Sequence, residues 1–492
     1  MSVGEKMVKQ LKMYIDGEWV DAGSGETFEV KSPATGEALA LVPKADREDV
    51  KKAIDAAKIA QKRISNMKIS ERVKLMYKMA EIIRPNIERF ARELSLEQGK
   101  PIRESRIELE DVEPNITWQA EDLKRLETPI LRGYANPDML YLVTREPIGV
   151  VGIITPWNYP WLMPAEFVAQ AILCGNSVVF KPASYTPISA IRFVECMEKA
   201  GVPKGVINLV TGPGPIVGAE IAENRNVDGI LLVGETLTGE NIAKAAGVKK
   251  ITLELGGNGP LIVMDDANIE KAVDDIVFGC YNNAGQVCCA NERILVHEKV
   301  HDKVVKMVVE KTKKMKLGDP LKDNTDIGPM NNEPVVKKVE MHIADAVNKG
   351  AKILYGGKRA KGFPTDLYFE PTVIDKVTPD MLINKEETFG PVAPFLTFSS
   401  IGEAVEIAND TPYGLSMAVH TNDLNTAFFF AEKLKAGQVV INGSVLLWDY
   451  HHPWAGVKRS GVGAVAGKWT IEAFTNIKTI LLRVGKPGGV SK

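Results

Sequence analysis

The chain has 492 residues, of which 25% are charged and 45% hydrophobic, and its formal net charge is −2. This composition is ordinary for a soluble globular protein, and the length suggests about three structural units. Because Lys and Arg are mixed with Asp and Glu, the charge gives no reason to expect nucleic acid or an anionic membrane surface as a partner.

Other broad classes are also disfavoured. The first 17 residues lack the apolar stretch of a secretory signal, and the most apolar span, 148–167, is interrupted by polar residues and prolines. A signal peptide or a membrane helix is therefore not expected. The five cysteines follow no regular spacing, unlike a disulfide framework, and the adjacent Cys288 and Cys289 cannot form half of a zinc site. We expect a reduced, cytoplasmic protein with no metal.

In chain order, a strand-like N-terminal region precedes two segments with helical apolar spacing, 47–64 and 70–96, and a strand at 139–144. From Gly149 to Gly257, short apolar runs alternate with helical patterns. The strands are expected at 149–155, 177–182, 206–212, 228–234 and 249–257. Such alternation indicates βαβ units around a mainly parallel sheet, so the predicted fold class is α/β with a doubly wound, Rossmann-like domain.

A second alternating run begins at Pro260 and predicts a second α/β domain. Its strands are expected at 260–265, 293–298, 352–357, 416–421 and 438–443. The first helix of this run, 268–281, leads into the stretch YNNAGQVCCA (281–290), whose tip would face the first domain. A ligand held by one domain could there meet chemistry from the other.

The C-terminal tail contains an isolated strand, 478–484, that we expect to pair with 139–144 and to present an edge that invites oligomerisation. Three parts of the chain follow from these patterns. They are a first α/β domain at 1–123 and 145–255, a second α/β domain at 256–458, and a small β-element for oligomerisation at 124–144 and 459–492.

Two glycine-rich turns are candidate phosphate loops, although the usual G-x-G-x-x-G fingerprint is missing at the first strand–helix turn. GPGPIVG (212–218) has the wrong spacing and two prolines, which is more typical of a tight turn. GETLTG (234–239) follows a strand and opens a helix, where backbone amides favour a pyrophosphate. Lys181, in FKPAS (180–184), ends a strand of the same sheet, where it is either a donor to ribose or phosphate or a solvated lysine.

Seven stretches resemble motifs of the aldehyde dehydrogenases, in the order found in that family. They are PWNYP (156–160), FKPAS (180–184), GETLTG (234–239), LELGG (253–257), NAGQVC (283–288), EETFGPV (386–392) and PWAGVKRSG (453–461). The resemblance runs from about residue 12 to the C-terminus. It implies an NAD(P)-dependent enzyme that oxidises an aldehyde to an acid, with a cofactor domain, a catalytic domain and an oligomerisation strand pair.

The resemblance implies three catalytic residues. Cys288 matches the nucleophile of the G-Q-x-C motif, whose thiolate forms a thiohemiacetal and, after hydride loss, a thioester. Glu254 matches the base that activates water for thioester hydrolysis, which favours hydrolysis over acyl transfer to coenzyme A. Asn158 matches the side chain that stabilises the oxyanion together with the backbone N–H of Cys288. Outside the motifs, Glu254 could be a salt-bridged strand end and Asn158 a turn former.

Cys289 is expected to play a different part from Cys288. Neighbouring residues in an extended segment point to opposite sides, so Cys289 would be a small buried residue that supports the loop.

The resemblance also implies a set of residues that hold the cofactor. Lys181 matches the lysine on the adenine ribose, Gly234 the pyrophosphate turn, and Glu387 the ligand of the nicotinamide ribose, with Phe389 near the ring. The full set is Thr155, Pro156, Trp157, Lys181, Ser184, Gly214, Gly218, Gly234, Glu235, Thr236, Leu255, Glu387 and Phe389.

Three residues depart from the family pattern. Ser184 stands where NAD-preferring members carry a glutamate that would repel a 2′-phosphate, so we predict that NADP is preferred and NAD possible. Glu235 stands where many members have serine, which weakens the expectation of phosphate contacts there. Phe167 stands where many relatives have a lysine that relays protons to Glu254, so we expect another proton route, through waters and Glu166.

Aromatic and imidazole side chains are the candidates for the substrate pocket, although most of them could equally be core. The expected lining is Tyr159, Val287, Val445, His452 and Trp454, with Trp161, Trp448 and His451 as further candidates. Such a pocket suits a small polar hydroxyaldehyde such as glyceraldehyde or lactaldehyde. The alternative is a semialdehyde whose remote carboxylate is anchored by Arg459 or a histidine.

Two other classes of protein stay open. A thiol hydrolase or acyltransferase would pair Cys288 with a histidine, but none of the six histidines stands in such a pattern. A non-catalytic binding protein on the same fold would have no reason to keep Cys288, Glu254 and Asn158 together. We expect a homodimer or homotetramer that acts on a small aldehyde, without a nucleic-acid or membrane partner.

Overall fold

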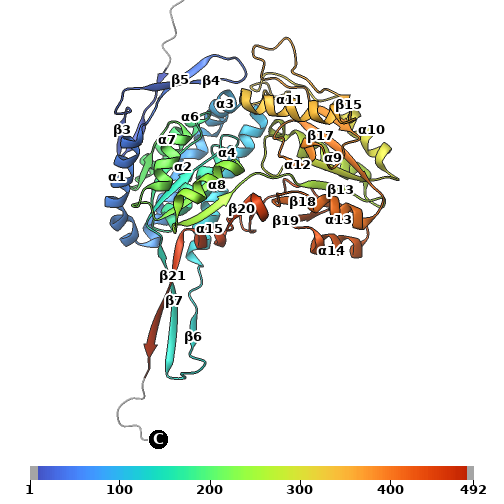
Figure 1. The fold of residues 1–492 in the computed structure, drawn as a ribbon. Helices are drawn as coiled ribbons and strands as arrows, with labels where there is room; N and C mark the ends of the chain where they lie inside the picture. Colours follow the sequence, from blue (N-terminus) through green and yellow to red (C-terminus); the bar gives the residue numbers. More distant parts are fainter. Residues whose placement is uncertain (1–8, 485–492) are drawn as a thin grey trace, which may run out of the picture.

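The computed structural model describes residues 9–484, and Figure 1 shows two α/β domains side by side with a β-arm projecting below them. The outer ends of the predicted domain ranges, 1–8 and 485–492, lie outside the described residues, as does the start of the segment tested for a signal peptide. Within the described residues, no helix combines the length and the apolarity needed to cross a membrane.

The first domain contains an eight-stranded sheet of order β20-β12-β11-β8-β9-β10-β2-β3. Its parallel centre consists of β8 (Val150–Ile154), β9 (Ser177–Lys181), β10 (Ile207–Leu209), β11 (Gly229–Val233) and β12 (Lys250–Glu254). These strands are largely buried apolar runs, as parallel sheets require, and they confirm the predicted doubly wound domain. Antiparallel edge strands complete the sheet: β20 (Gly461–Val462), β2 (Met13–Ile15) and β3 (Glu18–Val20).

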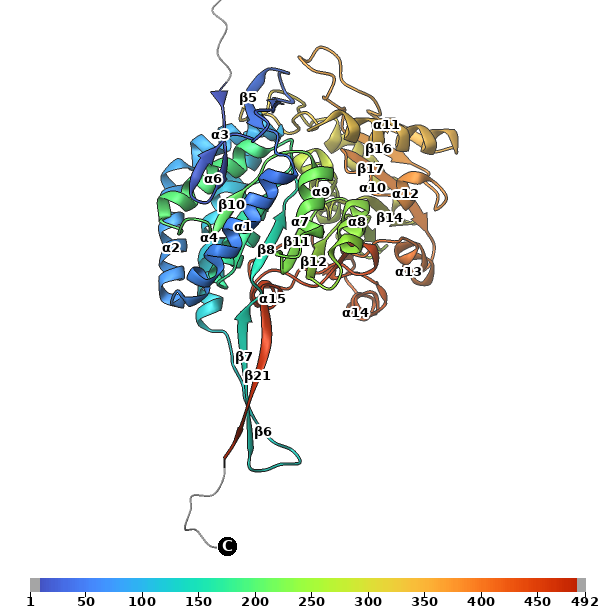
Figure 2. The same ribbon diagram turned by 60° about the vertical axis from the view of Figure 1, so that its left-hand side comes forward.

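Helices cover both faces of this sheet (Figure 2). One face carries α1 (Arg47–Asn66), α7 (Gly214–Glu223) and α8 (Thr236–Ala246). The other carries α2 (Ile69–Ile83), α3 (Ile87–Gln98), α4 (Ile102–Lys124), α5 (Leu162–Leu173) and α6 (Pro187–Ala200). The helical pattern at 70–96 is therefore two helices, broken by a 3₁₀ turn at Arg84–Asn86 that contains Pro85. Helix α4 is not predicted, because Pro114 interrupts its pattern.

The second domain contains a seven-stranded sheet of order β15-β16-β17-β14-β13-β18-β19. The strands are β13 (Pro260–Val263), β14 (Arg293–His297), β15 (Lys352–Tyr355), β16 (Thr372–Asp375), β17 (Val392–Phe398), β18 (Ser416–His420) and β19 (Gln438–Ile441). All neighbours are parallel except β15, which lies antiparallel at the edge. Strands β16 and β17 are absent from the sequence prediction.

Helices also cover both faces of the second sheet. One face carries α9 (Ile269–Tyr281) and α10 (His301–Thr312). The other carries α11 (Glu333–Asn348), α12 (Leu382–Lys385), α13 (Ile401–Asn409) and α14 (Leu424–Lys433).

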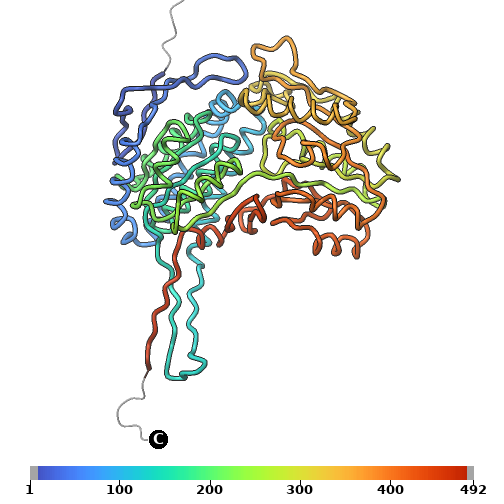
Figure 3. The backbone as a smooth tube through the Cα atoms, in the orientation of Figure 1, coloured from blue at the N-terminus to red at the C-terminus, as the bar shows by residue number. Residues whose placement is uncertain are grey.

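The projecting arm is a three-stranded antiparallel sheet of β6 (Ile130–Arg132), β7 (Met139–Pro147) and β21 (Thr475–Arg483), seen most simply in the tube of Figure 3. The register runs from Thr475 opposite Pro147 to Arg483 opposite Met139, which confirms the predicted pairing of the tail. Strand β20 and α15 (Lys468–Ala473) fall within the range predicted for the oligomerisation element, but β20 pairs with β12 of the first sheet. A small sheet of β1 (Lys9–Gln10), β5 (Ala38–Pro43) and β4 (Thr27–Lys31) completes the fold.

Candidate active site

A cavity of about 550 Å³ is lined by residues of both domains. The first domain contributes α4, the loop between β8 and α5, and the C-terminal ends of β11 and β12. The second contributes the turn after α9, the start of α11, and loops around 387–389 and 446–454. The cavity wall brings together the three predicted catalytic residues, Asn158, Glu254 and Cys288.

The turn that carries Cys288 has an unusual backbone. Asn283, Ala284 and Gly285 have φ values of 50°, 54° and 73°, a left-handed run that is costly for residues other than glycine. A side chain at Gly285 would collide with the carbonyl oxygen of Gly390, 2.1 Å from an added Cβ. The turn therefore depends on glycine there and on the bonds that hold its other members.

Hydrogen bonds from distant elements stabilise this turn. The Gln98 amide donates to Asn283 Oδ1 at 3.0 Å, and the Gln286 amide donates to the Asn283 carbonyl oxygen at 2.8 Å. The backbone N–H of Asn331 donates to Gln286 Oε1 at 2.9 Å, and that of Asn283 donates to Glu104 Oε2 at 2.9 Å. The Gln98, Asn283, Gln286 and Asn331 side chains are buried and Glu104 is half-buried, so hydrogen-bonded polar groups offset the backbone strain.

The two adjacent cysteines lie in a turn, closed by a hydrogen bond from the Ala290 N–H to the Val287 carbonyl oxygen at 3.0 Å. The expectation of an extended segment is therefore wrong, and both thiols line the cavity. Cys289 is buried and Cys288 is partly exposed. A hydrogen bond with Cys289, burial and the charge of Glu254 raise the pKa of Cys288 well above its ordinary value. The Cys288 thiol thus needs a base before it can act as a nucleophile.

Glu254 is the last residue of β12, and it pairs with Gly461 of β20. Burial raises the pKa of its carboxyl to about 7, although hydrogen bonds from the Cys288 thiol and the Trp454 indole oppose the rise. The indole nitrogen of Trp454 lies 3.5 Å from Glu254 Oε1. A carboxylate with a pKa near neutrality beside a thiol is suited to general-base chemistry.

Asn158 lies in the loop between β8 and α5, and its side-chain amide donates to the Gln286 carbonyl oxygen at 3.0 Å. The amide has a second hydrogen, which an oxyanion at Cys288 could accept. On the other side of the loop, Lys100 Nζ donates to the Asn158 carbonyl oxygen at 2.7 Å and to Glu108 Oε2 at 2.6 Å. Glu108 also accepts the N–H of Trp161 at 2.8 Å, so a buried ion pair holds the loop in place.

The Lys100 cluster is a part of the site that the sequence prediction misses. Glu104, Glu108 and Asp111 line the cavity from one side of α4, with Lys100 just before the helix. The spacing of these carboxylates is a helical one and could have drawn attention to this face, had α4 been predicted. Lys338 of α11 is a further cavity residue that no motif indicates.

The start of α8 carries the predicted pyrophosphate turn. The helix follows β11 directly, and no side chain caps its first turn. Thr236 Oγ1 is buried and has no hydrogen-bond partner within residues 9–484. The Glu235 carboxylate is exposed and accepts a hydrogen bond from Thr238 Oγ1 at 3.3 Å, so it turns back onto its own helix. Gly234, Glu235 and Leu255 lie in the cavity wall.

Lys181 and Ser184 lie at the C-terminal end of β9, away from the cavity wall. Burial lowers the pKa of Lys181 to about 8, and its Nζ donates to the Pro182 carbonyl oxygen at 3.0 Å. Ser184 Oγ donates to the Gly212 carbonyl oxygen at 3.0 Å. The neighbouring N–H of Thr155 donates to the Lys181 carbonyl oxygen at 3.1 Å.

Gly214 and Gly218 belong to α7. Gly214 is the first residue of the helix, and an added Cβ there would meet open space. Gly218 is buried, and an added Cβ would contact Ile154 and Ile242.

On the nicotinamide side of the predicted cofactor site, backbone N–H groups donate hydrogen bonds to carboxylates. The Gly257 N–H donates to Glu387 Oε1 at 3.0 Å. Glu292, which is buried, accepts the N–H groups of Thr388 at 2.8 Å and Phe389 at 2.9 Å. Phe389 has a positive φ of 58°, and its ring meets Trp157 edge to face at a centroid distance of 5.5 Å. Pro156, Trp157, Glu387 and Phe389 line the cavity.

These groups fit a dinucleotide. A helix start without a side-chain cap and with an unpartnered buried hydroxyl can bind a pyrophosphate, and the Lys181 ammonium near it can bind ribose or phosphate. Among the described residues, no cluster of three or more His, Cys, Asp or Glu side chains is arranged to hold a metal ion.

The predicted substrate residues divide into two groups. Tyr159, Val287, Trp454 and Trp448 line the cavity, and the Tyr159 hydroxyl donates to Asn282 Oδ1 at 3.2 Å. The others lie elsewhere, among them Val445, His452, Trp161, His451 and Arg459.

Burial and hydrogen bonding explain these corrections. Val445 is 0% exposed in the core of the second domain, and Trp161 packs between Phe90 and Phe193 in the first. The His452 ring accepts the Asp449 N–H at 3.1 Å and contacts Gln438 at 3.2 Å. Arg459 pairs with Glu240 at 2.7 Å.

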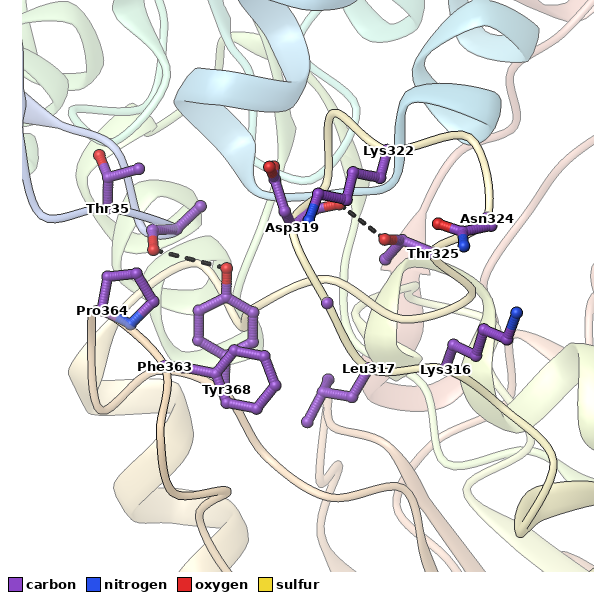
Figure 4. Close-up of a pocket in the computed structure, with 12 residues that line it drawn as sticks. Thr35, Lys316, Leu317, Asp319, Lys322, Asn324, Thr325, Phe363, Pro364 and Tyr368 are labelled. Atoms are coloured by element: carbon purple, nitrogen blue, oxygen red, sulfur yellow. Dashed lines mark hydrogen bonds between the residues drawn. The ribbon is translucent and has the colours of Figure 1, made fainter.

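A second cavity, of about 580 Å³, is lined by none of the predicted site residues (Figure 4). Its wall comes from the segments at 34–35, 316–325 and 363–368. The rings of Phe363 and Tyr368 stack at 4.1 Å, and the Tyr368 hydroxyl donates to the Ala34 carbonyl oxygen at 3.4 Å.

Comparison with known proteins places this site in a family. The sequence pattern of the aldehyde dehydrogenase family matches residues 19–480. Glutarate-semialdehyde dehydrogenase of Pseudomonas putida is 37% identical over 98% of this chain and 100% of the relative. D-glyceraldehyde dehydrogenase (NADP(+)) of Picrophilus torridus is 38% identical over 96% of each chain. The structure of an NAD-dependent aldehyde dehydrogenase from Sinorhizobium meliloti superposes with a TM-score of 0.94 at 39% identity, over 98% of this chain and 96% of that one. The chain therefore belongs to the aldehyde dehydrogenase family and is an NAD(P)-dependent oxidoreductase.

Proposed function

We propose that the protein oxidises a small polar hydroxyaldehyde, such as glyceraldehyde or lactaldehyde, to its acid, with NADP preferred over NAD. The observation that carries this proposal is the meeting of Cys288, Glu254 and Asn158 in one cavity wall, where the charge of Glu254 acts on the Cys288 thiol. A nucleophile, a base and an oxyanion donor within one cavity are the groups that aldehyde oxidation through a thioester requires.

Acylation of Cys288 begins with the removal of its proton by Glu254. The thiolate attacks the aldehyde carbon to give a thiohemiacetal, whose oxyanion accepts hydrogen bonds from the Asn158 amide and the Cys288 backbone N–H. One such donor is typically worth about 10²–10³-fold in rate. The bound nicotinamide supplies the hydride acceptor. Glu254 next releases the Cys288 proton to solvent. As a carboxylate again, it activates the water that hydrolyses the thioester and releases the acid.

The cofactor is expected to lie across the C-terminal edge of the first sheet. Lys181 would bind the adenine ribose or its 2′-phosphate, the start of α8 the pyrophosphate, and Glu387 the nicotinamide ribose. Because Ser184 places no carboxylate beside Lys181, nothing at this position would repel a 2′-phosphate.

Because some relatives use NADP and others use NAD, the cofactor preference of this protein has to be measured. The ratio of kcat/KM for NADP to kcat/KM for NAD should exceed one, and Ser184→Glu should lower that ratio about tenfold or more. Ser184→Ala is the matched control, since it removes the hydroxyl without adding charge. A clear NAD preference in the unchanged protein would contradict the proposal.

The charge of the cavity supports a neutral substrate over one with a remote carboxylate. Within the described wall, the cations are Lys100 and Lys338, and Lys100 is bound to Glu108 and Asn158. Glu104 and Asp111 lie nearby, and the proposed anchors Arg459 and His452 lie outside the wall. The remaining cation, Lys338, acts on the carboxylates of Glu387 and Glu292, so a semialdehyde carboxylate would have to compete with them for it.

A panel of aldehydes tests the substrate class. Glyceraldehyde and lactaldehyde should give a kcat/KM at least about tenfold above succinic and glutaric semialdehydes of similar length. The Pseudomonas putida relative acts on a semialdehyde by its name, so the reverse order would establish the alternative.

We also propose that the arm joins two or more copies into a homodimer or homotetramer. Exposed apolar side chains on β6 and β21, among them Ile130, Ile477 and Leu481, form an unpaired edge. Sedimentation analysis of Ile477→Lys and Leu481→Lys should show a smaller species than the unchanged protein. A cytoplasmic location stays a prediction.

A further inference from the structure

Glu166 is a buried carboxyl group to which the mechanism above gives no part. It lies on α5 in the loop-to-helix unit that begins with Asn158, it is 2% exposed, and it lines the same cavity as Glu254. Its Oε1 atom has no hydrogen-bond partner within residues 9–484. A buried carboxyl oxygen without a hydrogen-bond partner in the protein normally has a function or binds a water molecule.

The two carboxyl groups influence each other. Burial and the charge of Glu254 raise the pKa of Glu166 to about 8, and burial raises the pKa of Glu254 to about 7. Two buried carboxyls close to one another do not both ionise readily, so the pair holds one proton near neutral pH. The Trp454 indole donates to Glu254 and favours its charged form, whereas Glu166 Oε1 has no donor within residues 9–484, so the proton lies on Glu166 and Glu254 is free to act as a base.

No lysine occupies the position beside Glu254 that a relay would use. Phe167 is 1% exposed and packs in the core of the first domain. Within the described wall of the cavity, Lys100 is already bound by Glu108 and Asn158. The carboxyl group of Glu166 is therefore the titratable group available to Glu254 on the α5 side.

Further polar groups lie behind Glu166, between α4 and α5. Gln170 is one turn further along α5, it is 0% exposed, and neither atom of its amide has a partner within residues 9–484. Gln119 of α4 donates to the Glu166 carbonyl oxygen at 3.3 Å, and its Oε1 is likewise unpartnered among those residues. Buried polar groups of this kind are the usual binding sites of internal water.

We propose that Glu166 is a positioning residue that receives the proton from Glu254 during thioester hydrolysis and passes it on past Gln170 and Gln119. The proposal rests on the proposed function, because it requires a thioester at Cys288. An O–H bond of water breaks and its proton goes to Glu254, while the water oxygen bonds to the thioester carbon. The C–S bond then breaks and releases the acid and the Cys288 thiolate. Glu166 gives its proton to water held by the Gln170 and Gln119 amides and takes that of Glu254, which becomes a carboxylate again.

The test uses p-nitrophenyl acetate, an activated ester that acylates a thiolate without any cofactor. The initial burst of nitrophenolate measures acylation of Cys288, and the steady rate measures hydrolysis of the acyl-enzyme. Glu166→Gln should leave the size of the burst within about twofold and slow hydrolysis about tenfold. This loss of rate is smaller than the roughly 10²–10⁴-fold loss expected when a general base is removed. Gln170→Leu should slow hydrolysis in the same direction, with the burst unchanged.

The pH profile separates a proton role from a structural one. In the unchanged protein, hydrolysis should rise as Glu254 ionises through about pH 7, with a second inflection near pH 8 from Glu166. Glu166→Gln should remove the second inflection, and Glu166→Asp should restore one. The matched control is Glu97→Gln, because Glu97 is also buried with its pKa raised to about 8 but lies outside the cavity. This control should leave the profile unchanged.

The possible outcomes distinguish a failure of the role proposed for Glu166 from a failure of the proposed function. If Glu254→Gln loses hydrolysis of the acyl-enzyme while Glu166→Gln hydrolyses normally with both inflections, the role of Glu166 is overturned. If Glu254→Gln hydrolyses normally, or Cys288 of the unchanged protein is never acylated, the proposed function itself fails. If Glu166→Gln does not fold, Glu166→Asp still decides, because its second inflection should move to a different pH, and an inflection that stays at its original pH would overturn the assignment to Glu166.

Discussion

The turn that carries Cys288 and the loop at 444–454, which lies across the cavity from it, are built in opposite ways. The turn has a left-handed backbone run, buried side chains and hydrogen bonds from α3, α4 and Asn331. The loop is mostly exposed or half-buried, and Leu447 is 62% exposed. Its ties to other elements include the bond from the Tyr450 hydroxyl to Asp111 at 2.8 Å and that from the Gln438 amide to the Leu447 carbonyl oxygen at 2.9 Å.

The rigid turn serves the reaction, whereas the loosely held loop serves substrate binding. A nucleophile must be placed within a fraction of an ångström, so its turn is over-determined by buried partners. A surface loop with few bonds can change sequence without disturbing the core, so the substrate wall can vary while the chemistry stays the same. Recognisable sequence motifs therefore lie on the rigid side of the site.

Removing the nucleophile should have the largest effect. Cys288→Ser should lower kcat by more than about 10³-fold, because a serine hydroxyl at this position is a much weaker nucleophile than a thiolate. Cys289→Ser should retain most of the activity, although its thiol contacts Cys288. Steady-state assays with NADP and an aldehyde measure both, and the opposite pattern would assign the chemistry to Cys289.

Loosening the turn should have the next largest effect. Gln286→Leu removes the bonds to Asn283 and Asn331, and a displaced nucleophile should lower kcat about 10²-fold. Gln61→Leu is the matched control, because Gln61 also bridges two backbone groups, at Gly175 and Ser177, but lies outside the cavity. It should reduce thermal stability and leave kcat nearly unchanged. Equal losses of kcat in both variants would show that the turn has no special role.

Loosening the loop should change substrate binding more than chemistry. Tyr450→Phe removes the hydrogen bond to Asp111, whose net effect is about 1 kcal/mol, equivalent to a few-fold change in equilibrium. We expect KM for the aldehyde to rise severalfold while kcat stays within about twofold. Tyr355→Phe, a change on the distant strand β15, is the control. A fall in kcat with no change in KM would mean that the loop takes part in the chemistry.

The smallest effect should be a pH dependence of stability at the turn. Burial raises the pKa of Glu104 from 4.5 to about 7, and this group accepts the Asn283 N–H. A carboxyl with a raised folded pKa contributes stability below its unfolded pKa and loses it as pH rises through about 7. The Tm should therefore fall between about pH 4.5 and pH 7, and Glu104→Gln should flatten part of that fall. An unchanged slope would contradict the assignment.

The sequence predicts the parallel strands of the first sheet well, because each lies in a contiguous apolar run, and the three residues that short motifs indicate as catalytic lie in one cavity wall. It fails where the answer depends on packing between distant segments. Pro114 interrupts the helical spacing of apolar residues in α4, so neither this helix nor the Lys100 cluster beside it is predicted. Val445 is placed in the pocket by proximity to aromatic residues, but it packs in the second domain's core. The cysteine pair is interpreted as extended, and only the fold shows that a strained turn precedes it.

The pairing of β12 with β20 has a consequence for the order of synthesis and folding. Glu254 lies opposite Gly461, so the strand that carries the base receives its edge partner from about 200 residues further along the chain. The indole of Trp454 and the last strand of the arm also come from this late part of the chain. During translation the parallel strands can assemble early, but the cavity gains its remaining wall only after these late segments have left the ribosome. A reactive thiol is therefore made long before the pocket around it is complete, and chaperones or oxidants would meet Cys288 in that interval.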